Sequence, residues 1–342
     1  MTQPLSARPI AIANWLFGVA AFVFVMLVVG GITRLTESGL SITRWDLVTG
    51  TLPPLSDAAW QQQFDLYRQT PEFTQINGPA GMGLAEFKFI FFWEWFHRLI
   101  ARSIGLAFAL PLAWFWLRGA IPPGYKGRLV ALLALGGLQG AVGWLMVQSG
   151  LPEDMTDVSH FRLSAHLLIA LFTLAGLVWT ALDLRELAKT GANKPARLTP
   201  LAMGVGAVIF VQLLLGAWVA GLNAGLASDT WPLMQGRIVP EADWSKGALW
   251  TFTHEHFFIH FLHRWWALAA VLAVTVLARA DRRLGHRKIS VVMHSIVGVQ
   301  FLLGIWTVLS GVSLWIAVAH QLVGATLVAA VAWGAHVTGR RA

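Results

Sequence analysis

The chain has 342 residues, of which 56% are hydrophobic and 12% charged, and its mean hydropathy is +0.62, which excludes an ordinary water-soluble domain. Its net charge of +8 would suit nucleic acid in a soluble protein, but in a membrane protein positive charge is expected in loops that face the cytoplasm. The absence of cysteine excludes disulfides, thiolate metal sites and haem attachment through Cys-x-x-Cys-His, so a metal would need histidine, carboxylate, methionine or backbone ligands.

Eight apolar windows are each close to the roughly 20 residues that a helix needs to cross a bilayer. Each is predicted to be helical, because unpaired backbone groups cannot face lipid. The residues before the first window have no small-residue cleavage site, so we expect a retained span and not a signal peptide. In chain order, the predicted spans are 14–33, 93–117, 128–148, 163–182, 200–220, 258–278, 289–310 and 313–336.

Positive charge is concentrated on one side of the predicted membrane. The termini and the connections after the second, fourth and sixth spans contain fifteen of the 25 Lys and Arg residues, but only Asp183, Glu186 and Asp281 as acids. The other side has ten Lys or Arg and fourteen of the 17 acids. By the positive-inside rule, we expect a multi-pass protein of a bacterial inner membrane, with both termini cytoplasmic and the long loops 34–92 and 221–257 outside.

The two halves of the chain repeat each other in order, which indicates a duplication. The stretch Arg34-Leu-Thr-Glu-Ser-Gly-Leu-Ser through Trp45 and Pro54 matches Ala220-Gly-Leu-Asn-Ala-Gly-Leu-Ala through Trp231 and Pro240. Glu94-x-x-His97-Arg98 matches His260-x-x-His263-Arg264. In addition, Gln139 and Gly143 match Gln300 and Gly304, and His166 matches His320. Each copy has four spans, an even number, so both copies insert the same way up.

These observations predict an all-α integral membrane fold, with eight transmembrane helices in two pseudo-symmetric four-helix bundles that form a parallel tandem repeat. The N-terminal bundle covers residues 14–183 and the C-terminal bundle residues 200–336. We expect the N-terminal segment 1–13, the linker 184–199 and the tail 337–342 to be cytoplasmic.

Four of the eleven histidines occupy repeat-equivalent places within or at the outer ends of even-numbered spans: His97, His166, His263 and His320. Polar residues at such depth usually face the bundle interior and have a partner. Two neutral imidazoles from facing helices can bind both axial positions of a haem iron. A lone membrane histidine is more often a hydrogen-bonded packing residue, but four at duplicated positions favour haem ligation, with the histidine sites toward the periplasmic side.

Glu94 lies three residues before His97 and shares its helix face, whereas the equivalent residue of the second half is His260. A carboxylate beside a haem edge can accept a proton, orient a water or stabilise a cationic intermediate. The difference therefore indicates that the two halves have different roles. The alternative is an interfacial ion pair between Glu94 and Arg98 or Lys88.

Other polar residues allow two interpretations. Arg98 and Arg264 suit haem propionates and lipid phosphates equally well. Arg34 and Glu37, just past the first span, form either a second polar cluster or a solvated loop, and the solvated loop is slightly favoured.

The remaining histidines have no repeat mate to support a metal site. Those at the mouth of the sixth span, His254, His256 and His260, suggest zinc or copper, but the His-Glu-x-x-His pattern is absent, so water-facing or gating roles are favoured. We expect the others to be packing residues: His160, His286, His294 and His336.

Several ordered motifs resemble those of the haem A synthases, specifically the cysteine-free proteobacterial and mitochondrial branch. They are Gly30-Gly-x-Thr-Arg34-Leu-Thr-x-Ser-Gly-Leu-Ser, Glu86-Phe-Lys-x-Ile-Phe, Glu94-x-x-His97-Arg98 and His263-Arg264, and the resemblance extends over about residues 14–336. It implies oxidation of a methyl group of haem O to a formyl group, which gives haem A for terminal oxidases. Some members of the family have a cysteine pair in the first outer loop. This sequence has no cysteine, so a thiol cannot take part in haem transfer or electron delivery here.

Carried over by position, the resemblance implies haem B as a cofactor, with His263 and His320 as axial ligands in the C-terminal bundle. His97 and His166 would belong to the haem O site of the N-terminal bundle, and Glu94 would assist the oxidation. The implied partners are haem O synthase, which is a farnesyltransferase, assembly factors of terminal oxidases, an electron donor and membrane lipid, with no nucleic acid. A homo-oligomer is compatible with the sequence.

Two other functions fit parts of the sequence. A di-haem membrane cytochrome that only transfers electrons would have two equivalent haems, which the difference between Glu94 and His260 disfavours. A transporter would place charges near the bilayer midplane, whereas the ionisable residues here cluster toward one face.

Overall fold

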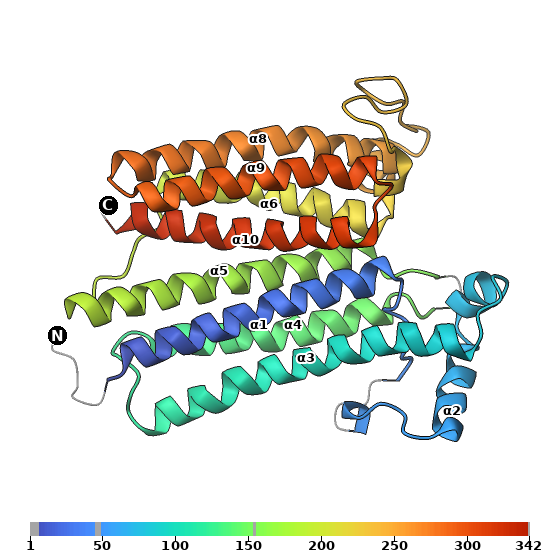
Figure 1. Cartoon of the computed structure of the whole chain (residues 1–342), viewed down its shortest axis with the longest axis horizontal. Coiled ribbons are helices and arrows are strands. Elements are labelled where there is room, and N and C mark those ends of the chain that lie inside the picture. The colour runs from blue at the N-terminus through green and yellow to red at the C-terminus, as the bar shows by residue number, and fades with distance from the viewer. Residues whose placement is uncertain (1–6, 45–48, 153–154, 341–342) are drawn as a thin grey trace.

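The computed structural model describes residues 7–44, 49–152 and 155–340, so Trp45 and the chain ends 1–6 and 341–342 lie outside the described residues. Within these ranges, regular structure is helical, apart from one isolated bridge between Met234 and Arg237. Figure 1 shows long helices side by side, with the short α2 at one end. The elements are α1 (Pro9–Leu35), η1 (Thr49–Thr51), α2 (Asp57–Tyr67), η2 (Phe73–Asn77), α3 (Leu84–Leu117), α4 (Lys126–Gln148), α5 (His160–Thr190), α6 (Pro200–Gly221), η3 (Ala224–Ala227), α7 (Ala248–His254), α8 (His256–Arg283), α9 (Arg287–Leu309) and α10 (Leu314–Gly339).

Eight of the described helices are long and apolar enough to cross a membrane, which confirms the predicted all-helical membrane fold. These spans are α1, α3, α4, α5, α6, α8, α9 and α10. Local residues define their ends. For example, the Thr199 hydroxyl accepts a hydrogen bond from the backbone N–H of Ala202, and Pro200 occupies the first turn of α6, where its missing N–H costs nothing.

Several helices extend beyond the predicted apolar windows, most of all at the start of α3, which begins at Leu84 and not at 93. α1 already begins at Pro9, and α10 ends at Gly339 inside the predicted tail. α5 continues to Thr190, so residues 184–190 of the predicted linker are helical, and Gly191, with φ of 68°, ends the helix. The stretch after the window consists mainly of Leu, Arg, Glu, Ala and Lys, which are strong helix formers in water as well as in lipid.

The spans pack as two groups, one from each half of the chain. In the first group, α1, α3, α4 and α5 form a ring in which each helix packs against two neighbours. In the second group, α8 packs against α6, α9 and α10. Between the groups, α5 packs against α6 and α10, and α1 packs against α10 (Figure 1). This arrangement is compatible with the predicted tandem repeat.

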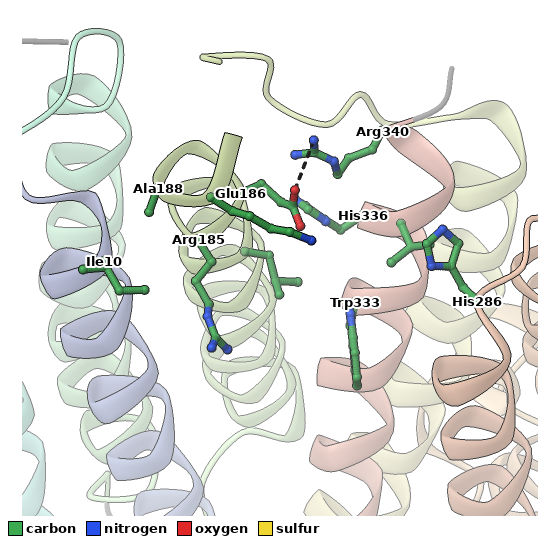
Figure 2. A pocket seen from close by; sticks show the side chains of 11 residues that line it. Ile10, Arg185, Glu186, Ala188, His286, Trp333, His336 and Arg340 are labelled. Carbon is green, nitrogen blue, oxygen red and sulfur yellow. Dashed lines mark ion pairs between the residues drawn. The ribbon is translucent and has the colours of Figure 1, made fainter. Parts of the chain in front are cut away.

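α1 begins and α10 ends at the same end of the molecule, where the predicted cytoplasmic charges gather (Figure 1). An open cavity of about 1040 Å³ lies at this end, with Arg185 and Glu186 of α5 on one side and Trp333 and Arg340 of α10 on the other (Figure 2). Arg185 is nineteen residues along α5 from His166, which corresponds to about 28 Å of helix. The cavity is therefore far from the predicted haem ligands.

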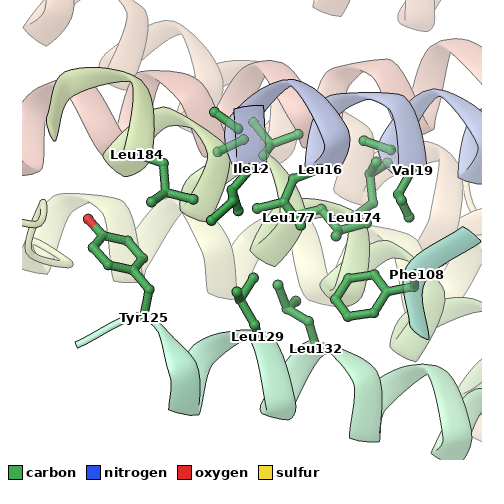
Figure 3. Close-up of a cluster of buried hydrophobic side chains, with 14 of the residues drawn as sticks. Ile12, Leu16, Val19, Phe108, Tyr125, Leu129, Leu132, Leu174, Leu177 and Leu184 are labelled. Atoms are coloured by element: carbon green, nitrogen blue, oxygen red, sulfur yellow. The ribbon is translucent and has the colours of Figure 1, made fainter. Parts of the chain in front are cut away.

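Apolar side chains fill both groups of helices. In the first, Ile12, Leu16, Leu129 and Leu174 are fully buried where α1, α4 and α5 meet (Figure 3). A second core surrounds Val274, Leu277 and Met293, and Leu213 and Val328 pack against both cores. Because lipid is as apolar as leucine, close packing contributes more to this association than exclusion of water does.

The first outer loop folds into a small cover over the outer end of α3. α2 packs against α3 through an aromatic cluster, in which the ring centroids of Phe64 and Tyr67 lie 5.1 and 5.2 Å from that of Phe87. Phe87 and Phe91 are followed on the same face of α3 by Glu94. The cover therefore lies directly beyond the predicted catalytic carboxylate.

Candidate functional site

Each of the four predicted ligand histidines lies against a glycine of the preceding span. A Cβ atom added to Gly30 would lie 3.3 Å from Nε2 of His97, one on Gly143 would lie 2.8 Å from Cε1 of His166, one on Gly216 would lie 2.8 Å from Cε1 of His263, and one on Gly304 would lie 3.1 Å from Cε1 of His320. Such distances are too short for ordinary contacts, so a larger residue would displace the imidazole. The glycines create the space in which the four rings lie.

The histidines form two pairs, one in each group of helices. His97 of α3 and His166 of α5 are within electrostatic range of each other, and so are His263 of α8 and His320 of α10. All four side chains are half-buried. Each pair therefore presents imidazole nitrogens from two different helices within one bundle.

Three of the four imidazoles contact a glutamine that lies one helical turn before the glycine. Nε2 of Gln139 is 3.1 Å from Nδ1 of His166, Nε2 of Gln212 is 3.2 Å from Nδ1 of His263, and Nε2 of Gln300 is 3.4 Å from Nε2 of His320. The spacing Gln-x-x-x-Gly places both residues on the helix face that meets the histidine. The sequence motifs did not single out Gln212, although this spacing could have identified it.

The side-chain carbonyls of the three glutamines bear on whether the adjacent histidines can bind a metal. Oε1 of each glutamine is buried and has no hydrogen-bond partner among the described residues. A half-turn of the amide brings Oε1 toward the imidazole, where it can accept a hydrogen bond from a ring N–H. The ring then keeps a free lone pair on its other nitrogen, which is the form that a metal-binding histidine needs.

Glu94 is buried, with 3% of its surface exposed, and both of its carboxylate oxygens have partners. Oε1 pairs with Nη2 of Arg98 at 2.5 Å, and Oε2 accepts hydrogen bonds from the Ser41 hydroxyl and the Ile42 backbone N–H, both at 2.7 Å. The ion pair considered as an alternative is therefore present. It fixes the carboxylate on the same helix face as His97 and does not turn it toward lipid.

The second half keeps the arginine but lacks the carboxylate. Arg264 donates to the carbonyls of Ser228 and Thr230 at 2.9 and 2.7 Å, and its Nε donates to Nε2 of His260 at 3.0 Å. In the first half, Arg98 likewise donates to the carbonyls of residues 42 and 44, which precede 228 and 230 by 186 positions. Both arginines hold their outer loops in place, and direct contacts with propionates or lipid phosphates stay predictions.

The three histidines at the mouth of the sixth span do not converge. His256 is exposed, and His260 is buried against Arg264. His254 stacks on Trp250, with ring centroids 5.8 Å apart. These positions give no support to a zinc or copper site.

The four histidines expected to be packing residues have different surroundings, and Nε2 of His160 is buried without a hydrogen-bond partner among the described residues. Nε2 of His336 is 2.9 Å from Oδ1 of Asp183, and Nδ1 of His294 is 2.7 Å from the carbonyl of Ser290 on its own helix. His160 packs its ring 4.9 Å from that of His254, and His286 lines the cavity at the basic end (Figure 2).

The solvated-loop interpretation of Arg34 is wrong. Its side chain, 15% exposed, donates to the carbonyls of Ala220 and Gly221 at 3.1 and 3.3 Å and to Oδ1 of Asn223 at 3.0 Å. Those carbonyls are at the C-terminus of α6, where they have no partner within the helix. Asn223 in turn donates to Glu37, which is exposed, at 3.4 Å. Arg34 therefore connects the two halves of the chain.

Comparison with known proteins gives one consistent result. Residues 13–332 match the family model COX15-CtaA, described as cytochrome oxidase assembly protein. The chain is 62% identical to a heme A synthase of Erythrobacter litoralis over 96% of this chain and 97% of the relative. It is 59% identical to a heme A synthase of Novosphingobium aromaticivorans, over 98% and 97% of the two chains, and 58% identical to one of Sphingopyxis alaskensis, over 99% and 95%.

Proposed function

This chain belongs to the COX15-CtaA family of cytochrome oxidase assembly proteins and acts as a haem A synthase, and we propose that its first bundle carries out the oxidation while its second bundle holds a resident haem. The reaction oxidises a methyl group of haem O to a formyl group and so gives haem A for terminal oxidases. The division of roles between the bundles rests on the chemistry of the two histidine pairs and their neighbours.

The observation that carries this division is the buried Glu94 beside His97, at the place where the second half has His260. The carboxylate is held by Arg98 and by the loop residues Ser41 and Ile42, so it has a fixed position. A purely electron-transferring di-haem cytochrome would be expected to surround both haems alike. The first bundle differs from the second at this position, which favours chemistry in the first.

The residues of the second bundle fit a resident haem B. His263 and His320 offer nitrogen ligands from two helices, and Gly216 and Gly304 leave room for their rings. The buried, unpartnered Oε1 atoms of Gln212 and Gln300 can each accept from the adjacent imidazole once its other nitrogen binds iron. When bound there, haem B would supply one-electron transfer.

In the first bundle, His97 and His166 would hold the iron of the substrate haem O. Glu94 would then be placed to accept or return a proton at a carboxylate oxygen beside the reacting methyl group, and Arg98 would hold that carboxylate in place. The aromatic cover formed by α2 and η2 lies over this end of α3 and limits access of water.

The wider setting follows from the family and from the charges. We place the eight spans in a bacterial inner membrane, with the basic end cytoplasmic and the histidines toward the periplasm. Haem O synthase as the source of substrate, oxidase assembly factors as recipients of haem A, and a separate electron donor are the expected partners.

Replacing Glu94 with Gln tests the assignment of the catalytic carboxylate. Gln has the same shape but cannot act as a base, so haem A formation should fall by about 100-fold or more while haem B stays bound. Haem extraction and chromatography measure the product, and the reduced-minus-oxidised spectrum measures the resident haem.

Asp65→Asn, an exposed carboxylate on α2, is the matched control and should form haem A at the normal rate. A normal haem A yield from Glu94→Gln would refute the role of Glu94.

A further inference from the structure

The residue one turn before the histidine-contacting glycine differs in only one of the four spans. It is glutamine before Gly143, Gly216 and Gly304, but before Gly30 it is Met26. Met26 precedes Gln212 by 186 positions, the same offset that relates Gly30 to Gly216. In the repeat, Met26 is therefore the equivalent of Gln212, the residue that contacts His263.

The ring of His97 is also turned differently from the other three. At Gly143, Gly216 and Gly304, the ring atoms nearest to an added Cβ are Cε1, then Nδ1, then Nε2. At Gly30 the nearest atom is Nε2, followed by Cδ2. His97 therefore presents another edge of its imidazole to the neighbouring helix, and this occurs at the site that lacks the glutamine.

The two side chains act differently on an imidazole. An amide carbonyl accepts the ring N–H, fixes the tautomer and orientation, and raises the basicity of the ligand, whereas a thioether is only a weak acceptor. Within the described part of the chain, no hydrogen bond to the ring of His97 is formed, whereas His166 of the same bundle contacts Gln139. The first bundle thus has one fixed and one adjustable histidine.

We propose that His97 is the exchangeable iron ligand, because Met26 leaves its ring free to turn, and that this lets haem enter and leave the first bundle, while Gln212 fixes His263 and retains the haem of the second. Met26 and Gln212 are positioning residues that act through the histidines. The proposal deepens the proposed function, because it rests on haem binding at both histidine pairs.

The arrangement has a consequence for the reaction. Glu94 and His97 share a face of α3, so release of iron by His97 would take place next to the carboxylate. His166, held by Gln139, would keep the substrate in the bundle meanwhile.

A reciprocal exchange of the two residues tests the proposal. Met and Gln are both unbranched and of similar length, so Met26→Gln and Gln212→Met change the hydrogen bond more than the packing. Each full-length variant is purified in detergent and titrated with ferric haem to fill the first bundle. Transfer of haem to excess apomyoglobin should then show a fast phase from the first bundle and a slow phase from the second.

Met26→Gln should slow the fast phase by about 10-fold, and Gln212→Met should speed the slow phase by about 10-fold, because outer partners of metal-bound histidines have effects of this size. As a second measurement, carbon monoxide should bind the reduced first-bundle haem of the wild type. It should bind less of that haem in Met26→Gln, and it should newly bind the second haem in Gln212→Met.

Val25→Gln, which adds an amide at the neighbouring, 47% exposed position of α1, is the control and should behave like the wild type. Unchanged transfer rates and carbon monoxide binding in Met26→Gln would overturn the proposal. This test stands even if Gln212→Met does not fold. A first bundle that takes up no haem would also overturn the proposal. Failure of the proposed function is distinguished by the Glu94→Gln variant, which keeps Met26 and His97, so that its haem transfer rates should stay at the wild-type values while its haem A yield falls.

Discussion

An imidazole inside a membrane is stable only if its nitrogens find partners, and the structure shows two ways of providing them. His294 is held by a carbonyl of its own helix, whereas His263 faces Gln212 and the interior of the second bundle. In the first arrangement the histidine is exposed, and its Nδ1 has its partner within the same helix. The second leaves a nitrogen for a metal, so removal of the two histidines should have different results.

Replacing His263 with Ala should therefore remove the resident haem B, and the haem B signal in the reduced-minus-oxidised spectrum should fall to less than about a tenth. His97→Ala should keep that signal but lower haem A formation, because its ring belongs to the other bundle. His294→Ala should change neither measurement. An unchanged spectrum in His263→Ala would refute its assignment as an axial ligand.

At the scale of elements, the cover formed by α2 and η2 contains a buried carboxyl group that has no counterpart in the second half. Glu72 is 5% exposed, and its Oε2 has no hydrogen-bond partner among the described residues. Burial raises the pKa of Glu72 from 4.5 to about 8, the Tyr67 hydroxyl partly opposes this rise, and the charges of Glu94, Glu37 and Asp157 add to it. The folded cover therefore holds a proton that the unfolded loop releases near pH 4.5.

This difference predicts how the stability of the cover depends on pH. A raised carboxyl pKa means that the folded form binds the proton more tightly, so its stability is highest below about pH 4.5, falls as the pH rises to about 8, and is level above that. Hydrogen exchange of residues 57–77, corrected for intrinsic rates, should show progressive loss of protection between pH 5 and 8.

Glu72→Gln should remove this dependence, whereas Asp65→Asn on the exposed face of α2 should retain it. The same pH dependence in Glu72→Gln would show that another group is responsible.

At the scale of the whole molecule, polar contacts connect the two bundles at both ends. At the outer end, Arg34 of α1 binds the last carbonyls of α6. At the basic end, Asp183 of α5 is fully buried between Arg128 at 2.6 Å and His336 of α10 at 2.9 Å. Nearby, Glu186 pairs with Arg340 at 3.3 Å across the cavity, but both side chains are about one-third exposed (Figure 2).

The two ion pairs at the basic end should differ strongly in their contribution to stability. Asp183→Ala leaves Arg128 and His336 without their buried partner, so we expect it to lower the free energy of unfolding by about 3 kcal/mol. Glu186→Ala breaks the partly exposed pair and should cost less than about 1 kcal/mol. Unfolding in detergent micelles, followed by tryptophan fluorescence, measures both, and equal effects would contradict the distinction.

Much of the fold and part of the site could be predicted from local features of the chain. The eight spans follow from the length of the apolar windows, because a continuous apolar stretch of about 20 residues crosses a bilayer as a helix that pairs its own backbone groups. The candidate ligands His97, His166, His263 and His320 follow from the duplication, and the difference between Glu94 and His260 follows from helical spacing. Helix ends were predicted less well, because α5 leaves the apolar window without leaving the helical conformation.

By itself, then, the sequence determined the number of spans and their repeat and pointed to the candidate site residues, since each is set by local composition or by an i, i+3 or i, i+4 spacing. Only the tertiary structure decided that Arg34 reaches across to α6, that Gln212 contacts His263, and that the ring of His97 is turned differently against Gly30. These contacts join residues far apart in the chain. They depend on how each helix is rotated against its neighbours, and no single helix carries that information.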